Sequence, residues 1–199
     1  MMDLIAASLG FVSLAAAVGI PFLLSSEDLG GNLTRFTVRL ALVYYAAALT
    51  MMLLMQPAQW QARDVSGRLT RWLWTWAWLI FVVHVACAFH FFHHWSHAEA
   101  VRHTAEVSGF GPGIYASCFF TVLWGMDLAA WWWRPGWYAG RSSWIDYLLH
   151  GFMLFMVFNA TVVFESGGTR WAGLVLFTEL AAVFLLRSQL SRRKPEPAV

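Results

Sequence analysis

The sequence has few charged residues and few cysteines. Only 12% of its 199 residues are Asp, Glu, Lys or Arg, about half the share of an ordinary soluble domain. The formal net charge is +2, so the chain lacks the basic surface that binds nucleic acid. The two cysteines form no CxxC motif, and neither a phosphate-binding loop nor an HExxH motif is present. The sequence therefore gives no signal for these common soluble functions.

Apolar residues take the place of the missing charges. They make up 59% of the chain, which includes 13 Trp and 16 Phe, and the mean hydropathy is +0.57. Tryptophan is typical of membrane interfaces. A chain of this length has room for about six membrane spans of about 20 residues each, with short loops between them.

Six long apolar runs are separated by breaks rich in Gly, Pro and Ser. Because they are apolar all round and do not alternate, they predict helices and not strands. The predicted spans are residues 4–24, 35–55, 72–94, 113–133, 144–164 and 171–190. We expect an all-α, polytopic integral membrane protein that forms a six-helix transmembrane bundle. Residues 1–190 would form a single membrane domain, and residues 191–199 a polar cytoplasmic tail.

The first run and the basic residues predict the topology. The first run has no basic leader and no small-residue cleavage site before Pro21, so we expect a retained helix and not a signal peptide. Nine Lys and Arg residues fall on the side of the C-terminus: Arg63, Arg68, Arg71, Arg134, Arg141, Arg187, Arg192, Arg193 and Lys194. The other side has Arg35, Arg102 and Arg170. The excess predicts cytoplasmic termini and an outward, periplasm-facing end for the third span.

The third span ends in a stripe of histidines. At about 100° per residue, the four side chains occupy one helical arc of about 100°, and they are His90, His93, His94 and His97. Such spacings let neighbouring imidazoles share one ion, and imidazole suits copper, iron or zinc. Glu99, or Glu165 from the fifth span, could complete the shell, whereas His103 falls on the opposite arc. The alternative is a polar, pH-responsive or structural helix end.

Two short strings carry resemblances. The segment His90-x-x-His93-His94 resembles one histidine box of the membrane-bound fatty-acid hydroxylase and desaturase superfamily. That family uses three such boxes around a cytoplasmic di-iron centre. The remaining histidines here, His84, His103 and His150, form no second box, so the activity is not carried over. The string from His93 to His97 resembles uncharacterised bacterial polytopic membrane proteins and is consistent with a bacterial inner membrane.

Ionisable and polar residues also fall inside the predicted spans, where they are costly and often functional. Counting about 1.5 Å per residue puts His84 and Glu179 near the midplane, and Asp127 and His150 at one matched depth toward the cytoplasm. We therefore expect an Asp127–His150 pair. Together these side chains predict an intramembrane polar network, which comprises Arg39, Asp127, His150, Asn159 and Glu179. Such a network could conduct protons or simply hold the bundle together.

Three functions remain open from the sequence. The first is a membrane metal-binding protein, with redox or small-molecule chemistry at the histidine stripe as its expected activity if it is an enzyme. The second is a non-catalytic accessory subunit, or a proton-conducting transporter module, with partner subunits in a membrane complex. The third is a haem b electron carrier with His84 and His150 as axial ligands.

Overall fold

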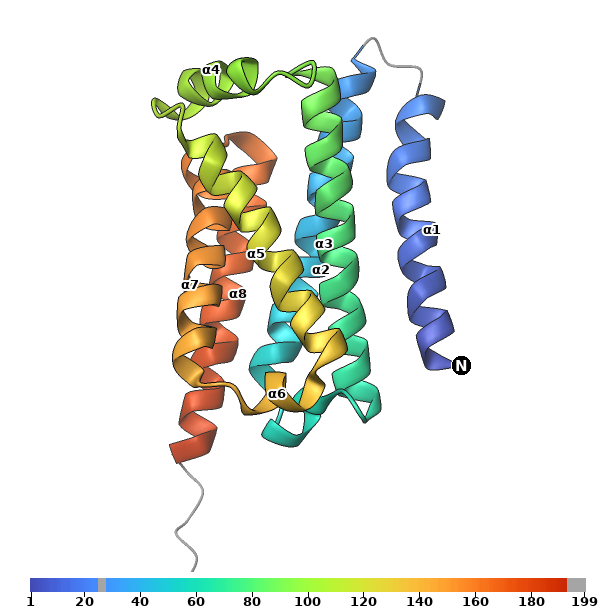
Figure 1. Ribbon diagram of the computed structural model, residues 1–199, viewed down its shortest axis with the longest axis vertical. Helices are drawn as coiled ribbons and strands as arrows, with labels where there is room; N and C mark the ends of the chain where they lie inside the picture. Colours follow the sequence, from blue (N-terminus) through green and yellow to red (C-terminus); the bar gives the residue numbers. More distant parts are fainter. Residues whose placement is uncertain (25–27, 193–199) are drawn as a thin grey trace, which may run out of the picture.

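The computed structural model describes residues 1–24 and 28–192, with side chains described as far as residue 190. Six helices in this part of the chain are long and apolar enough to cross a membrane. They are α1 (Met2–Leu23), α2 (Leu29–Leu54), α3 (Val65–Phe91), α5 (Gly113–Trp133), α7 (Ser143–Phe158), which continues into the π-helical turn η2 (Asn159–Val163), and α8 (Gly167–Arg192). They stand side by side as a bundle (Figure 1). All six predicted spans are therefore confirmed as helices. The span predicted at residues 113–133 has the same first and last residue in the structure.

Helices α2 and α3 begin six and seven residues before their apolar runs. Helix α2 starts at Leu29 because the Asp28 carboxylate accepts a hydrogen bond from the Gly31 N–H at 2.8 Å. Helix α3 starts at Val65, where Asp64 accepts from the Gly67 N–H in the same way. An N-cap of this kind satisfies backbone donors that the first helical turn leaves open. A count of apolar residues alone misses these polar first turns.

Helix α3 ends earlier than predicted, and this corrects the histidine stripe. It stops at Phe91 and not at residue 94, because His94 and Trp95 have positive φ angles of 47° and 59°. Ser96 then caps the next helix, α4 (His97–Ser108), by accepting from the Glu99 N–H. Left-handed backbone ends a right-handed helix, so the four histidines do not share one helical face.

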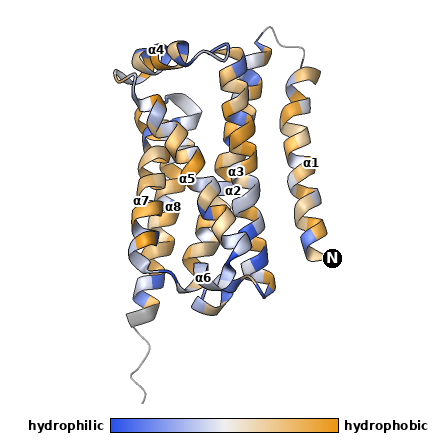
Figure 2. Cartoon of the chain, viewed as in Figure 1, coloured by the Kyte–Doolittle hydropathy of each residue, from blue (hydrophilic) through white to orange (hydrophobic). Residues whose placement is uncertain are grey.

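Short helices cover the two ends of the bundle. Helix α4 lies across one end, which we call the α4 end, and presents many hydrophilic residues (Figure 2). The helices η1 (Pro57–Gln61) and α6 (Pro135–Gly140) lie at the opposite, α6 end. The N-terminus of α1 and the C-terminal end of α8 both lie at the α6 end (Figure 1). Most of the tail predicted at 191–199 lies outside the described residues.

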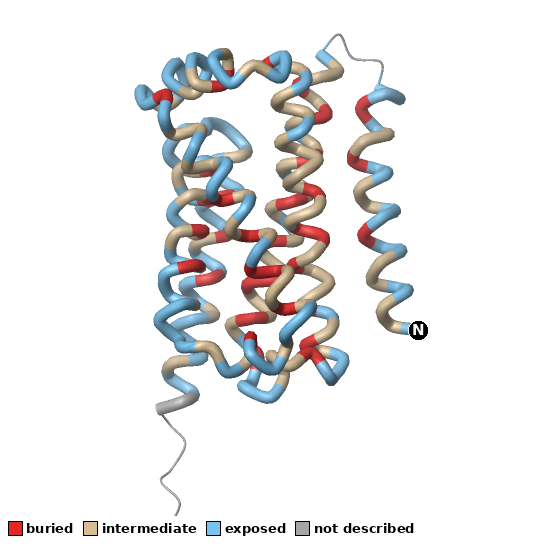
Figure 3. Tube along the Cα trace, in the orientation of Figure 1, coloured by how far each residue is buried: buried red, intermediate tan, exposed pale blue. Residues whose placement is uncertain are grey.

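The tightest packing is in the middle of the bundle, where buried positions of several helices meet (Figure 3). Its largest fully buried side chains are aromatic and include Tyr45, Trp74, Trp124 and Trp131. The rings of Trp74 and Trp124 lie 4.7 Å apart, and the Tyr45 ring lies within 5.6 Å of both. Helices α1 and α8 leave large apolar side chains exposed, which is the surface expected of helices that face lipid. This aromatic centre separates two cavities.

Candidate functional site

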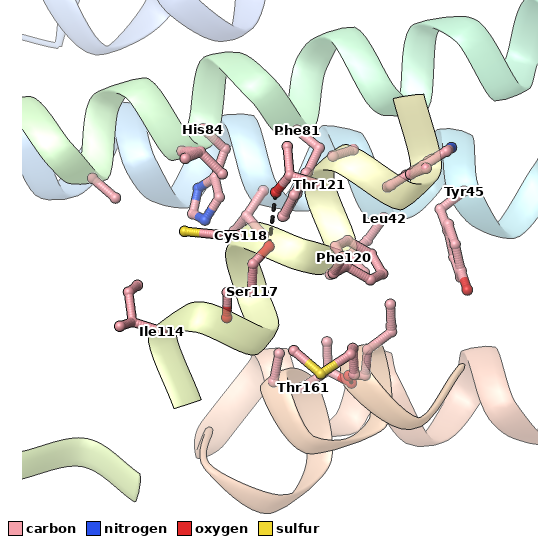
Figure 4. A pocket seen from close by; sticks show the side chains of 18 of the residues that line it. Leu42, Tyr45, Phe81, His84, Ile114, Ser117, Cys118, Phe120, Thr121 and Thr161 are labelled. Atoms are coloured by element: carbon pink, nitrogen blue, oxygen red, sulfur yellow. Dashed lines mark hydrogen bonds between the residues drawn. The ribbon is translucent and has the colours of Figure 1, made fainter. Parts of the chain in front are cut away.

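The first cavity lies near the α4 end, between α2, α3, α5 and the α7–η2 helix. Its volume is about 550 Å³, within the usual range for a small-molecule site. Figure 4 shows side chains from α2, α3 and α5 facing it, with Thr161 of η2 on the opposite side. The wall is mainly apolar, and its members include Leu42, Phe81, Val85, Ile114, Phe120 and Val157. We call this space the α4-end cavity.

Three polar atoms in the wall of this cavity are buried without a hydrogen-bond partner in the described part of the chain. They are the Tyr45 hydroxyl, the Trp124 indole nitrogen and Nδ1 of His93. Their side chains are 1%, 2% and 7% exposed. Leaving a buried polar group unpaired costs about 1–3 kcal/mol, and such groups are rare enough to need an explanation. Donors and acceptors without partners are therefore a distinctive feature of this cavity.

Two further reactive side chains meet on the wall. The Cys118 thiol extends toward the His84 ring (Figure 4), and both residues line the α4-end cavity. Nδ1 of His84 lies 3.0 Å from the carbonyl oxygen of Thr34, so this nitrogen carries the hydrogen in that contact. His84 stands seven residues, about 10 Å, from the end of α3 at Phe91. His84 therefore lies closer to the end of α3 than to its middle, because α3 begins and ends earlier than its apolar run.

The four histidines of the predicted stripe separate in the structure. His90 and His94 are exposed, and His97 is the first residue of α4. His93 instead turns inward, with its ring 5.3 Å from that of His103. Burial lowers the pKa of the His93 imidazole, and the charge of His103 acts in the same direction. The prediction that assigned His103 to the opposite arc is therefore reversed by the turn between α3 and α4.

The described residues contain no preformed site for the predicted metal binding. Among the described residues, no group of three or more His, Cys, Asp or Glu side chains is arranged to hold an ion. Glu165 lines the α4-end cavity, but neither it nor Arg39 forms a hydrogen bond or ion pair with any described residue. The structure brings two of the imidazoles together, His93 and His103, and leaves the other proposed ligands apart. Metal binding stays a prediction.

Asp127 is the centre of a polar cluster near the α6 end. Its carboxylate accepts from Arg141 Nη1 at 2.6 Å, from the Trp74 indole N–H at 3.0 Å and from the Tyr138 hydroxyl at 3.1 Å. The side chains of Asp127 and Arg141 are 0% and 3% exposed. The predicted Asp127–His150 hydrogen bond is not formed, because these three donors occupy the carboxylate. Sequence reasoning counted Arg141 only as a topology signal.

Aromatic rings cover one side of this cluster. The Arg141 guanidinium lies 3.8 Å over the Tyr138 ring, which stacks on Trp131 at 4.8 Å with an interplanar angle of 3°. Burial raises the pKa of the Tyr138 hydroxyl well above its ordinary value, and the nearby Asp127 carboxylate adds to this. Tyr138 therefore stays a neutral donor to Asp127. A buried ion pair with this many partners holds α6 against α5.

A second cavity, the α6-end cavity, lies between α2, α7 and α8, and its volume is about 800 Å³. His150, Asp146 and Arg187 are among its lining residues. Nδ1 of His150 is buried with no hydrogen-bond partner in the residues described, and its ring lies 5.8 Å from that of Trp74. His84 and His150, predicted as a haem pair, thus line different cavities on either side of the aromatic centre.

The other residues of the predicted polar network bond to residues outside that network or to none. The Asn159 amide donates back to the Phe155 carbonyl of its own helix, and Glu179 accepts from the Thr50 hydroxyl at 2.9 Å. Within residues 1–24 and 28–192, no hydrogen bond or ion pair links any two of the five predicted members, which are Arg39, Asp127, His150, Asn159 and Glu179. The five side chains are therefore not joined directly to one another.

Comparison with models of known protein families, with curated proteins and with solved structures finds no match to this chain. The candidate sites therefore rest on their own geometry. Of the features above, the α4-end cavity combines the most elements of a binding site: apolar walls, a suitable volume, and buried polar atoms without a partner among the described residues.

Proposed function

We propose that this protein is an integral membrane protein that binds a lipophilic small molecule in the α4-end cavity. The observation that carries the proposal is the coincidence of an apolar cavity of about 550 Å³ with three buried polar atoms that have no partner among the described residues. Burial without a partner is unfavourable in the empty protein, and a ligand that supplies the partner removes the cost.

The orientation follows from the basic residues. Six arginines lie on or beside the elements of the α6 end, namely Arg63, Arg68, Arg71, Arg134, Arg141 and Arg187, and three lie on or beside those of the α4 end, namely Arg35, Arg102 and Arg170. The sequence has three more basic residues after Leu190, which are Arg192, Arg193 and Lys194. The excess favours a cytoplasmic α6 end with both termini inside, and an α4 end that faces the periplasm across a bacterial inner membrane. In this orientation the ligand enters from the membrane or from its outer surface.

The chemistry of the wall restricts the ligand. The indole N–H of Trp124 can only donate a hydrogen bond, and the Tyr45 hydroxyl can donate one as well. Both lie deep in the bundle, whereas His93 and Glu165 lie where the chain turns at the α4 end. The cavity thus fits an elongated molecule with an apolar body and a hydrogen-bond-accepting oxygen, such as a long-chain ketone or ester.

The native Cys118 allows a direct test. Because Cys118 lines the cavity and Cys87 does not, modification of Cys118 by a thiosulfonate reagent should slow when the cavity is filled. We expect 2-dodecanone to protect Cys118 of the purified full-length protein more strongly than dodecane does, since only the ketone accepts a hydrogen bond. One such bond predicts about a fivefold difference between the two probes.

Matched variants complete the experiment. Tyr45→Phe and Trp124→Phe should reduce the advantage of the ketone while leaving the fold intact, and Cys118→Ala identifies the labelled thiol. Equal protection by the two probes in the unmodified protein, or no protection by either, would contradict the proposal. Mass spectrometry of an organic extract of the purified protein would then identify the natural ligand.

A second candidate function is metal binding at the α4 end, as the sequence predicts. The observation that favours it is the His93–His103 contact, with rings 5.3 Å apart and Nδ1 of His93 without a partner among the described residues. Metal analysis of the purified protein should then give a stoichiometric transition metal. His93→Ala and His103→Ala should lose it, and His90→Ala, an exposed control, should retain it. The same low metal content in every protein would exclude this site.

A further inference from the structure

The α6-end cavity is built for an amphiphile of a different kind, and we propose that it binds a zwitterionic aminophospholipid of the membrane. This proposal goes beyond the ligand of the α4-end cavity, since the two cavities share no lining residue. It rests on two opposite charges with free bonding capacity, one buried polar atom without a partner, and the depth at which each of these lies.

The negative partner is Asp146. Its Oδ1 accepts from Nε of Arg141 at 2.6 Å, and its Oδ2 accepts no hydrogen bond from any residue in the described part of the chain. Its side chain is 39% exposed, in contrast to the fully buried Asp127. A primary ammonium group carries three donors, one of which would satisfy the free carboxylate oxygen.

The positive partner is Arg187 of α8. It donates to the backbone carbonyls of Leu53 and Met55 at the end of α2. A guanidinium carries five N–H donors, so Arg187 retains donors for a further anion. Because Arg187 is an exposed lining residue of the cavity, a phosphate beside it would make charge-assisted hydrogen bonds.

The depths of these groups match the layers of a phospholipid. Asp146 lies three residues from the start of the candidate span that begins at Ser143, and Arg187 three residues before Leu190, where the candidate span of α8 ends, so each is about 5 Å inside the end of its span. This is the level of the headgroups. Nδ1 of His150, one turn deeper, could bond the glycerol ester region.

The rest of the cavity suits an acyl chain. Leu154 and Leu180 line it about 15 Å from the same ends of α7 and α8. Apolar side chains from α2 and α8, such as Leu49 and Phe177, complete this wall. An ammonium site and a phosphate site at one level, with an apolar slot deeper in the bundle, thus match the parts of an aminophospholipid.

The test compares three short-chain lipids on the delipidated full-length protein in detergent, followed by native mass spectrometry. Dioctanoyl phosphatidylethanolamine should bind about tenfold more tightly than the matching phosphatidylcholine or phosphatidylglycerol. Phosphatidylcholine has a cation without N–H donors, and phosphatidylglycerol has no cation. Equal binding of the three lipids, or a preference for phosphatidylglycerol, would overturn the proposal without any variant.

Two variants locate the site. Asp146→Asn should remove the preference for phosphatidylethanolamine, whereas Glu106→Gln, which neutralises an exposed carboxylate at the α4 end, should not. Gly151 lines the cavity, and a Cβ there meets nothing within 4 Å, so Gly151→Leu should fill the slot and weaken all three lipids about tenfold.

Gly19→Leu is the matched control, because Gly19 is a helical glycine with equally open space that lines neither cavity. Unchanged lipid binding by Gly151→Leu would overturn the assignment to this cavity. Protection of Cys118 by 2-dodecanone should be unaffected by Gly151→Leu, so a failure here is distinct from a failure of the α4-end site.

Discussion

The Asp127 cluster and the polar atoms in the wall of the α4-end cavity differ in how fully they are hydrogen-bonded. Near the α6 end, the Asp127 carboxylate accepts three hydrogen bonds, and its partner Arg141 also pairs with Asp146. In the wall of the α4-end cavity, the Tyr45 hydroxyl, the Trp124 indole nitrogen and Nδ1 of His93 are buried with no partner among the described residues. A satisfied network stabilises a fold, whereas an unsatisfied set is typical of a site where something binds.

The largest expected effect breaks the satisfied network. Arg141→Gln should destabilise the protein by about 3–5 kcal/mol, because it leaves the buried Asp127 charge without its partner. The measurement is unfolding by denaturant in detergent micelles.

The control for this variant is Arg102→Gln. Arg102 is exposed and pairs with Glu99 at 3.4 Å, so its loss should cost less than about 1 kcal/mol. If Arg141→Gln unfolds at the same denaturant concentration as Arg102→Gln, the Asp127 network does not stabilise the α6 end.

An intermediate effect compares two buried tyrosines. Tyr138→Phe removes a donor to Asp127 and should destabilise the protein by about 1–2 kcal/mol. Tyr45→Phe removes a hydroxyl that has no partner among the described residues, so it should be neutral or stabilising in the empty protein. Unfolding midpoints of the two variants in the absence of ligand test this difference in sign. Equal destabilisation would mean that the Tyr45 hydroxyl is satisfied after all.

The smallest expected effect is the pH dependence of stability that His93 causes at the α4 end. Since burial lowers the pKa of His93 in the folded protein, the unfolded chain binds the proton more readily. Stability should therefore be constant above the ordinary histidine pKa of about 6.5 and fall as the pH drops below it toward the folded value.

Thermal unfolding at pH 8 and pH 5 measures this loss. His93→Gln should reduce it, and the exposed His90→Gln should not. If His93→Gln keeps the full acid sensitivity of the unmodified protein, the His93 environment is not responsible.

Sequence predictions that depend on residues close together along the chain were more accurate than those that depend on how the chain turns and packs. The six predicted spans are confirmed as helices long and apolar enough to cross a membrane, because about 20 consecutive apolar residues satisfy their own backbone only as a helix. Helix starts at Leu29 and Val65 were missed, although Asp28 and Asp64 provide a local capping signal that could have located them. The positive φ angles of His94 and Trp95 were not foreseeable from composition, because only about a few per cent of non-glycine residues adopt that conformation.

The sequence by itself determined the elements: six apolar helices, their order, and a basic excess at one end of the bundle. Only the tertiary structure decided which buried polar groups bond to one another. It joined Asp127 to Arg141, Trp74 and Tyr138 and left His150 unpaired. It also split the histidine stripe and enclosed two cavities around the aromatic centre. The physical reason is that helix formation depends on neighbouring residues along the chain, whereas buried polar partners depend on how separate helices pack.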